Sequence, residues 1–414
     1  MPNALTWLFL LAVATAAAMR LWLAARQIRH VRAHRAAVPG EFAASITLGA
    51  HQKAADYTVA KVKLGAWDTA LEVAIVLAFT LAGGLQGLAD LWARALEPGS
   101  LWHGSALLLS LFLLQAALSL PLAYYRVFVL EQRFGFNRMT LALFLSDLAK
   151  QAALALVLGV PLLLAVLWLM ARMGEQWWLY VWIVLTAFGL LLQLIFPAYI
   201  LPLFNKFTPV TEGELARRVA ALLERCGFRS RGLYVMDGSK RSSHGNAFFA
   251  GFGATKRIVL FDTLVERLSP SEVEAVLAHE LGHYKLHHVL KMLALNAAIT
   301  FAGLWILGRL IDQAWFYAGL GVTTQSTATA LALFMLALPE FTFFLHPLMA
   351  RYSRRREFEA DAYATRHAES GELVRALVKL YNDNAATLTP DPLHSAFYDS
   401  HPPAAIRIAR LATR

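Results

Sequence analysis

The sequence has little cysteine and little charge. It contains a single cysteine, Cys226, among 414 residues, which excludes a disulfide framework within the chain and a cysteine-rich metal site. A metal would therefore need histidine and carboxylate ligands. Charged residues make up 16% of the chain and apolar or aromatic residues 58%, whereas soluble proteins carry about 25% charged residues. Much of the surface must face something other than water, and a chain this apolar is not disordered.

Internal repeats, low-complexity segments and aromatic-rich basic stretches are also missing from the sequence. Lysine and arginine exceed the acidic residues, which gives a formal net charge of +10. Nucleic-acid sites of the single-stranded type combine a basic groove with exposed aromatic side chains, and we exclude nucleic acid as a partner. In a membrane protein, an excess of lysine and arginine usually marks the cytoplasmic loops.

Long apolar runs are the dominant feature of the chain. A helix needs about 20 mostly apolar residues to cross a bilayer, and about seven runs meet that length. The sequence therefore predicts a mainly α-helical, polytopic membrane protein. The runs are Ala4–Leu23, Leu71–Trp92, Ser105–Tyr125, Ala152–Met170, Trp178–Leu201, Val289–Leu310 and Ala328–Leu348.

Positive charge alternates between the loops that join these runs. The first and third loops are rich in lysine and arginine, whereas the second and fourth hold little more than Arg94 and Arg172. Because basic residues gather on the cytoplasmic side, we expect the N-terminus outside. Residues 205–288 and the tail from Arg351 then lie in the cytoplasm.

The segment 205–288 has the mixed charge and turn residues of a water-exposed α+β unit. Thr211 and Glu214 form a possible capping box for an amphipathic helix that ends near Arg225. Gly232–Met236 and Arg257–Phe261 are expected strands, and Asn246–Phe249 is a possible third. The sequence Ser269-Pro270-Ser271-Glu272 predicts the start of a helix that continues past His283.

On that helix lies HELGH, from His279 to His283. A spacing of four residues places both imidazoles on one helical face, where they can bind one cation. Glu280 lies beside them and could take a proton from a metal-bound water. Zinc accepts nitrogen and oxygen ligands, and a catalytic zinc site leaves one position free for water. We expect one zinc ion per chain.

A third ligand is expected from the segment SRRREFEAD, which follows the last apolar run. Glu357 and Asp361 are four residues apart and share a helical face, whereas Glu359 points elsewhere. One of the two could bind the metal while the other accepts the free N–H of a ligand histidine. A solvated charged face is the alternative explanation for these residues.

Several other polar residues are candidates for the site. The possible strand that contains Asn246, Ala247 and Phe248 could pair its open edge with an extended peptide; without the metal motif, an ordinary glycine-rich hairpin would be equally compatible. Asn205, Arg241 and His244 lie in the same water-exposed segment. His401, before two prolines, could donate a hydrogen bond to an oxyanion; a surface histidine beside prolines is the alternative. One of His287 and His288 could support the metal site, or both could lie at the membrane interface. Glu340 within the seventh run should face a cavity or a partner.

The motifs HELGHYKLHH, GSKRSSHGNAFFAGF, KRIVLFDTL, REFEADAYA and SHPP, together with IFPAYILPLFNKFTP and EQRFGFN, closely resemble the type I CAAX prenyl proteases, integral-membrane zinc metalloproteases. The resemblance covers most of the chain in the same order. It implies seven membrane helices around a large chamber and a gluzincin-type catalytic domain on the cytoplasmic side.

The same resemblance implies roles for individual residues. It assigns the zinc ligands to His279, His283 and Glu357, the general base to Glu280, and an outer position beside the metal to Asp361. It places Asn246 on the strand that binds substrate backbone, and His401 and Arg407 near the reacting carbonyl. Ile406 stands where such proteins often have an acidic residue, which leaves the partner of Arg407 open.

These features predict four segments: membrane helices one to five over residues 1–204, a cytoplasmic catalytic segment over 205–288, helices six and seven over 289–350, and a cytoplasmic segment over 351–414 that completes the zinc site. The resemblance implies removal of a C-terminal tripeptide after a prenylated cysteine. A quality-control protease of broad specificity is the main alternative, and a channel or transporter with a structural metal is a second. The composition favours a bacterial inner membrane; in a eukaryote the resemblance implies the endoplasmic reticulum.

Overall fold

The structure, a computed structural model, describes residues 2–250 and 257–412 and is mainly helical. Within those residues, six helices are long and apolar enough to cross a membrane, and a bent pair makes a seventh. The prediction of a polytopic helical protein is confirmed. The membrane part consists of α1 (Ala4–Ala33), α2 (Leu48–Phe79), α3 (Gly84–Ala93), α4 (Leu101–Tyr125), α5 (Leu141–Leu154), α6 (Val160–Arg172), α7 (Trp177–Ile195), α8 (Leu201–Phe204), α12 (His288–Leu310), α13 (Ala314–Gly319) and α14 (Thr327–Thr342).

The second apolar run, Leu71–Trp92, is present as a bent pair of helices and not as one continuous helix. Helix α2 ends at Phe79, and α3 starts at Gly84 after a bend of 49°. Gly83 has a φ of 82°, a conformation that glycine adopts without steric cost. A Cβ atom at Gly84 would lie 2.6 Å from the carbonyl oxygen of Ala78. The two glycines therefore allow the chain to bend between α2 and α3.

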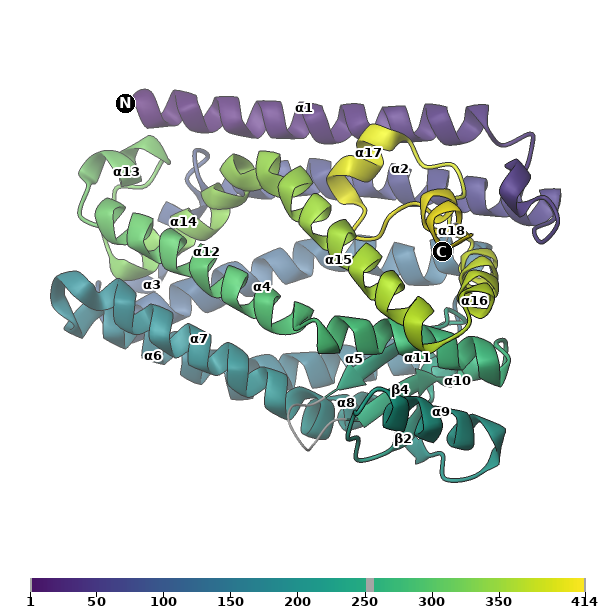
Figure 1. The fold of residues 1–414 in the computed structure, drawn as a ribbon. Coiled ribbons are helices and arrows are strands. Elements are labelled where there is room, and N and C mark those ends of the chain that lie inside the picture. The colour runs from purple at the N-terminus through teal and green to yellow at the C-terminus, as the bar shows by residue number, and fades with distance from the viewer. Residues whose placement is uncertain (1, 251–256, 413–414) are drawn as a thin grey trace.

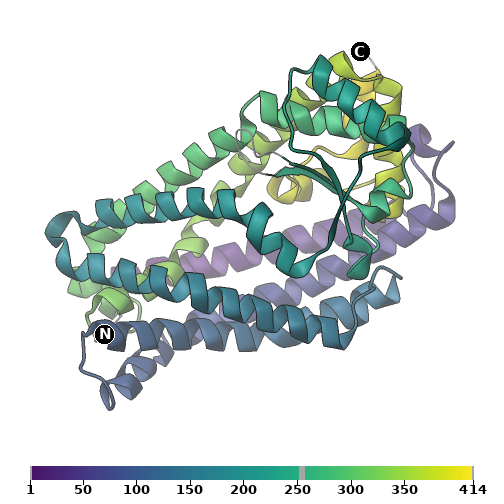
Figure 2. The same ribbon diagram turned by 90° about the horizontal axis from the view of Figure 1, so that it is seen from below.

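The long helices run side by side, and the two termini lie at opposite ends of the bundle (Figures 1 and 2). Residues of α1, α2, α4 and α14 line a cavity of about 860 Å³. Glu340 of α14 borders this cavity and lies 3.7 Å from Arg20 of α1, measured from Oε1 to a guanidinium nitrogen. As predicted for an ionisable residue within a span, Glu340 has both a cavity and a charged partner.

A small α+β unit lies at one end of the long helices (Figure 2). Its four strands have the order β1-β2-β4-β3, with β2 and β4 parallel and the other pairs antiparallel. The expected strands are present with bounds shifted by at most one residue. The elements are β1 (Phe207–Pro209), α9 (Gly213–Arg225), β2 (Leu233–Met236), β3 (Ala247–Ala250), β4 (Arg257–Phe261), α10 (Asp262–Val265) and α11 (Pro270–Lys285).

Two helix starts test the capping predictions. Helix α11 begins with the expected capping box, in which Ser269 accepts from the Glu272 amide and Glu272 accepts from the Ser269 amide. Helix α9 ends at Arg225 as expected, but the Thr211–Glu214 box does not form, since the N-cap residue is Glu212 and no side chain caps the helix. The helix therefore starts one residue later than expected, at Gly213, which has a φ of 93°.

Helix α15 (His346–His367) continues from α14 through a short turn, so that a single 41-residue helical stretch, Thr327–His367, leads out of the bundle. It packs against α11 in a core that contains Ala278, Leu281 and Ala364. Three further helices complete this end of the molecule: α16 (Ser370–Asp383), α17 (Pro392–Tyr398) and α18 (Ala404–Ala412). The division into four functional segments stays a prediction.

Candidate metal centre

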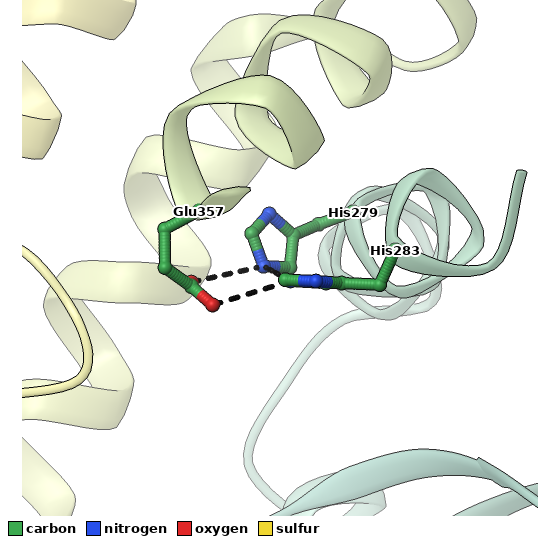
Figure 3. Close-up of side chains that lie close together, drawn as sticks. All are labelled: His279, His283 and Glu357. Carbon is green, nitrogen blue, oxygen red and sulfur yellow. Dashed lines mark hydrogen bonds and ion pairs between the residues drawn. The ribbon is translucent and has the colours of Figure 1, made fainter. Parts of the chain in front are cut away.

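His279 and His283 lie on one face of α11 and point toward the same spot (Figure 3). Their Nε2 atoms are 3.2 Å apart. His279 is 6% exposed, because the core beneath α11 covers it. The four-residue spacing therefore brings both imidazoles together, as predicted from the sequence.

Glu357 of α15 faces the two histidines across the helix pair (Figure 3). Its Oε2 atom is 3.4 Å from His279 Nε2, and its Oε1 atom is 3.3 Å from His283 Nε2. Ligands about 2.0–2.1 Å from a tetrahedral zinc ion are separated by about 3.3 Å, which fits this triangle. With two nitrogens and one carboxylate, a tetrahedral ion would have a fourth position free. Among the described residues, His279, His283 and Glu357 form the cluster of histidine and acidic side chains that could hold a metal ion.

Asp361 and Arg407 support the triangle from behind. The Oδ1 atom of Asp361 is 2.8 Å from His279 Nδ1, and Arg407 donates two hydrogen bonds to the same carboxylate, at 2.5 and 3.0 Å. All three side chains are buried. Asp361 is thus the partner of Arg407 that the sequence left open at Ile406.

Two side chains of α11, His279 and Glu280, have pKa values above their ordinary values, so both favour their protonated forms. Burial lowers the pKa of His279, but Asp361 and Glu357 raise it more, to about 9. Burial raises the pKa of Glu280, and the neighbouring histidines oppose that rise. A carboxyl group with a raised pKa is suited to accept and return a proton near neutral pH.

The C-terminal segment brings His401 to the same place. Its Nε2 atom lies 3.5 Å from Glu357 Oε1, and Ser400 Oγ lies 3.0 Å from its Nδ1. The His401 side chain is 61% exposed. It therefore borders the metal centre from the open side, where a bound substrate could reach it.

Strand β3 carries Asn246, Ala247 and Phe248 at or next to its start, and within the described residues it is one of the two outer strands of the sheet, with β1 at the opposite edge. Asn246 is exposed, whereas Ala247 is buried. The strand contacts α11. Gly251, Phe252 and Lys256 of the two adjoining motifs lie outside the described residues.

Other polar residues near this strand connect the α+β unit to the long helices instead. Arg241 binds Asp147 of α5 at 2.7 and 2.9 Å and donates to Asn205 Oδ1 at 2.8 Å. His244 Nε2 lies 3.4 Å from Glu131, which follows α4 and accepts from Tyr57 of α2. These contacts fix the metal-centre unit on the membrane helices, a role that no motif indicated.

Gly282 has a structural role that the sequence motifs did not indicate. A Cβ atom at this position would lie 2.9 Å from the Cα atom of Ala360 and 3.0 Å from the Cβ atom of Tyr363. Because both atoms belong to α15, only glycine lets α11 approach the helix that carries Glu357. The glycine of HELGH is thus a spacing residue.

We expect Gly282→Ala to weaken metal binding and to destabilise the chain by about 1–3 kcal/mol, the usual effect of overpacking. The added methyl group would push α15, and Glu357 with it, away from the histidines. Zinc affinity and thermal unfolding measure the two effects. Gly371→Ala in α16 is the matched control, since its Cβ would make only an ordinary contact, at 3.5 Å with the end of Arg375. Equal zinc affinity in Gly282→Ala would contradict the spacing role.

Comparison with protein families gives two matches that together cover most of the chain. Residues 27–206 match the CAAX prenyl protease N-terminal family with five membrane helices, and residues 209–414 match peptidase family M48. The fold is similar to the crystal structure of Ste24p from S. mikatae, with a TM-score of 0.91 and 31% sequence identity. That alignment covers 99% of this chain and 100% of the other.

Three curated relatives named CAAX prenyl protease 1, or its homologue, are similar to this chain. The chain is 37% identical to CAAX prenyl protease 1 of Saccharomyces cerevisiae, over 72% of this chain and 69% of the relative. It is 40% identical to the homologue of Dictyostelium discoideum, over 68% and 67%, and 33% identical to the homologue of Homo sapiens, over 73% and 72%. The chain therefore belongs to peptidase family M48 and, within it, to the CAAX prenyl protease 1 family of membrane zinc metalloendopeptidases.

Proposed function

We propose that this chain cleaves peptide bonds at one zinc ion held by His279, His283 and Glu357. The single observation that carries the proposal is the triangle of ligand atoms, 3.2–3.4 Å apart, with a spacing that suits tetrahedral zinc. When bound there, zinc supplies acidification of water and polarisation of the scissile carbonyl.

The chain's own residues perform the remaining steps. Glu280 removes a proton from the attacking water and later delivers it to the leaving amine. His401 donates a hydrogen bond to the oxyanion that develops on the carbonyl. Asp361 accepts the Nδ1–H of His279 and so fixes its tautomer. Arg407 holds Asp361 in place and adds positive charge 3.8 Å from Glu357 Oε2.

The substrate is proposed to lie in extended form along the outer edge of β3. Asn246, Ala247 and Phe248 would offer backbone groups to it, as an edge strand does when it binds a peptide. The relatives are named as proteases of prenylated CAAX sequences, and the resemblance of the motifs implies cleavage after the prenylated cysteine with release of the C-terminal tripeptide. The alternation of basic loops supports an N-terminus outside and a cytoplasmic metal centre. The composition favours a bacterial inner membrane, and the endoplasmic reticulum is the alternative in a eukaryote.

A pair of peptides tests the substrate. We expect a farnesylated peptide with a CAAX end to be cut after its cysteine and its unmodified twin to be cut much more slowly, because only the first presents a lipid to the membrane helices. Mass spectrometry of the released tripeptide measures both rates. Equal cleavage of the twins would contradict prenyl specificity and favour the broad quality-control function.

Metal removal tests the chemistry. Treatment with ortho-phenanthroline is expected to abolish cleavage, and added zinc should restore it, since the ligand atoms come from helices held together by an apolar core. The non-chelating meta isomer serves as the control. Circular dichroism should show unchanged helix content throughout, and cleavage that persists after zinc is lost would exclude the mechanism.

A further inference from the structure

His283 has a second ring nitrogen, which faces away from the metal triangle, and this atom has a specific partner. The Nδ1 atom of His283 lies 3.1 Å from the Nδ1 atom of His288, and the two rings meet edge to face at 75°. The Nε2 atom of His288 lies 3.1 Å from Glu359 Oε2. We infer that His288 and Glu359 are positioning residues that fix the tautomer and orientation of His283; the inference rests on the proposed zinc site.

The proton arrangement in this chain of contacts has one consistent solution. If His283 gives its Nε2 lone pair to zinc, its neutral ring carries the proton on Nδ1 and must donate it. His288 then accepts at Nδ1, which leaves its own proton on Nε2. Glu359 Oε2 accepts a hydrogen bond from that N–H, and its Oε1 atom accepts one from Arg355 Nε at 3.2 Å. Each contact thus joins one donor to one acceptor.

The backbone conformation between α11 and α12 places His288 next to His283. In an uninterrupted α-helix, residues five apart differ by about 140° around the axis, so the two rings would diverge. His287 breaks the helix between α11 and α12 with a φ of 58°, in the left-handed region that is uncommon for residues other than glycine. Arg356, itself 6% exposed, donates to the His288 carbonyl at 3.0 Å.

Both zinc histidines are thereby oriented from one helix. Asp361 of α15 contacts His279 directly. Glu359 lies two residues from Glu357, about 200° around the helix, and cannot reach the metal. His288, which is 4% exposed, bridges the gap to His283. The position of Glu359 is consistent with the prediction that this residue points away from the ligand triangle. Its hydrogen-bond partner, His288, belongs to α12.

Two substitutions of His288, to asparagine and to leucine, separate the effect of hydrogen bonding from that of packing, because the two new side chains have nearly the same shape. The asparagine of His288→Asn keeps an acceptor oxygen near the place of Nδ1, whereas the leucine of His288→Leu is similar in shape to asparagine and has no polar side-chain atom. We expect His288→Leu to lower zinc affinity by about 10–100-fold, the usual cost of losing such a partner, and His288→Asn to recover most of it. Zinc affinity is measured by competition with a chelating dye, and the visible spectrum of the cobalt-substituted protein reports ligand orientation.

Further variants complete the test. Glu359→Gln should retain affinity because its carbonyl oxygen still accepts from His288, whereas Glu359→Leu should lose part of it. His287→Asn is the matched control, since His287 is exposed and asparagine tolerates the left-handed conformation. Equal losses in His288→Asn and His288→Leu, with equally lowered unfolding temperatures and unshifted cobalt spectra, would reduce His288 to a packing residue and overturn the inference. A wild-type chain that binds no zinc would instead overturn the proposed function.

Discussion

Glu280→Gln is expected to bind zinc as the wild-type chain does and to cleave peptide about 10²–10⁴-fold more slowly, the usual contribution of a general acid–base group. Glutamine has nearly the same shape but cannot accept the proton of the attacking water. The neighbouring ligands His279 and His283 keep their positions on α11, so metal content should not change. Zinc per chain and the rate of peptide cleavage are measured on the same preparation.

Glu266→Gln is the matched control for this experiment. It makes the same chemical change on an exposed carboxylate of the same unit, and it should leave both zinc content and rate unchanged. Full activity in Glu280→Gln would refute its role as a base. A channel or transporter with a structural metal would also predict an unimpaired Glu280→Gln variant.

Glu357→Gln is expected to lose both metal and activity. Glu357 is 4% exposed and supplies the only negative charge in the ligand triangle. Its loss should weaken zinc binding by more than the roughly 10–100-fold that an outer hydrogen-bond partner contributes. Equilibrium dialysis against buffered zinc measures the affinity, and peptide cleavage at saturating zinc measures what activity remains.

Two comparisons make the Glu357 result specific. Glu369→Gln changes an exposed carboxylate just beyond α15 and should bind zinc normally. Asp361→Asn should weaken zinc binding less than Glu357→Gln, because Asp361 contacts a ligand and not the open side of the triangle. The reverse order of the two affinities would mean that Asp361 is the direct ligand.

Local patterns predicted the parts of this protein that depend on neighbours in sequence. Apolar runs of sufficient length indicated the membrane helices, since a bilayer accepts few other structures. The Ser269 capping box and the spacing of His279 and His283 indicated a helix with two imidazoles on one face. Failures arose where backbone conformation decided the outcome: Gly83 bends the second run, and Gly213 displaces the start of α9.

The residue types of the metal centre were thus determined by the sequence alone: two histidines one helical turn apart, a glutamate beside them and an acidic pair four residues apart. Helix periodicity left open which of Glu357 and Asp361 would be the ligand; the family resemblance assigned Glu357, and the tertiary structure places that carboxylate against both histidines. Only the tertiary structure decided that Arg407 holds Asp361 and that His288 lies beside His283. These contacts join α11, α12, α15 and α18, which are up to 128 residues apart in the chain. Helical periodicity governs neighbours within one turn, whereas contacts between helices depend on how closely they pack, and Gly282 sets that distance between α11 and α15.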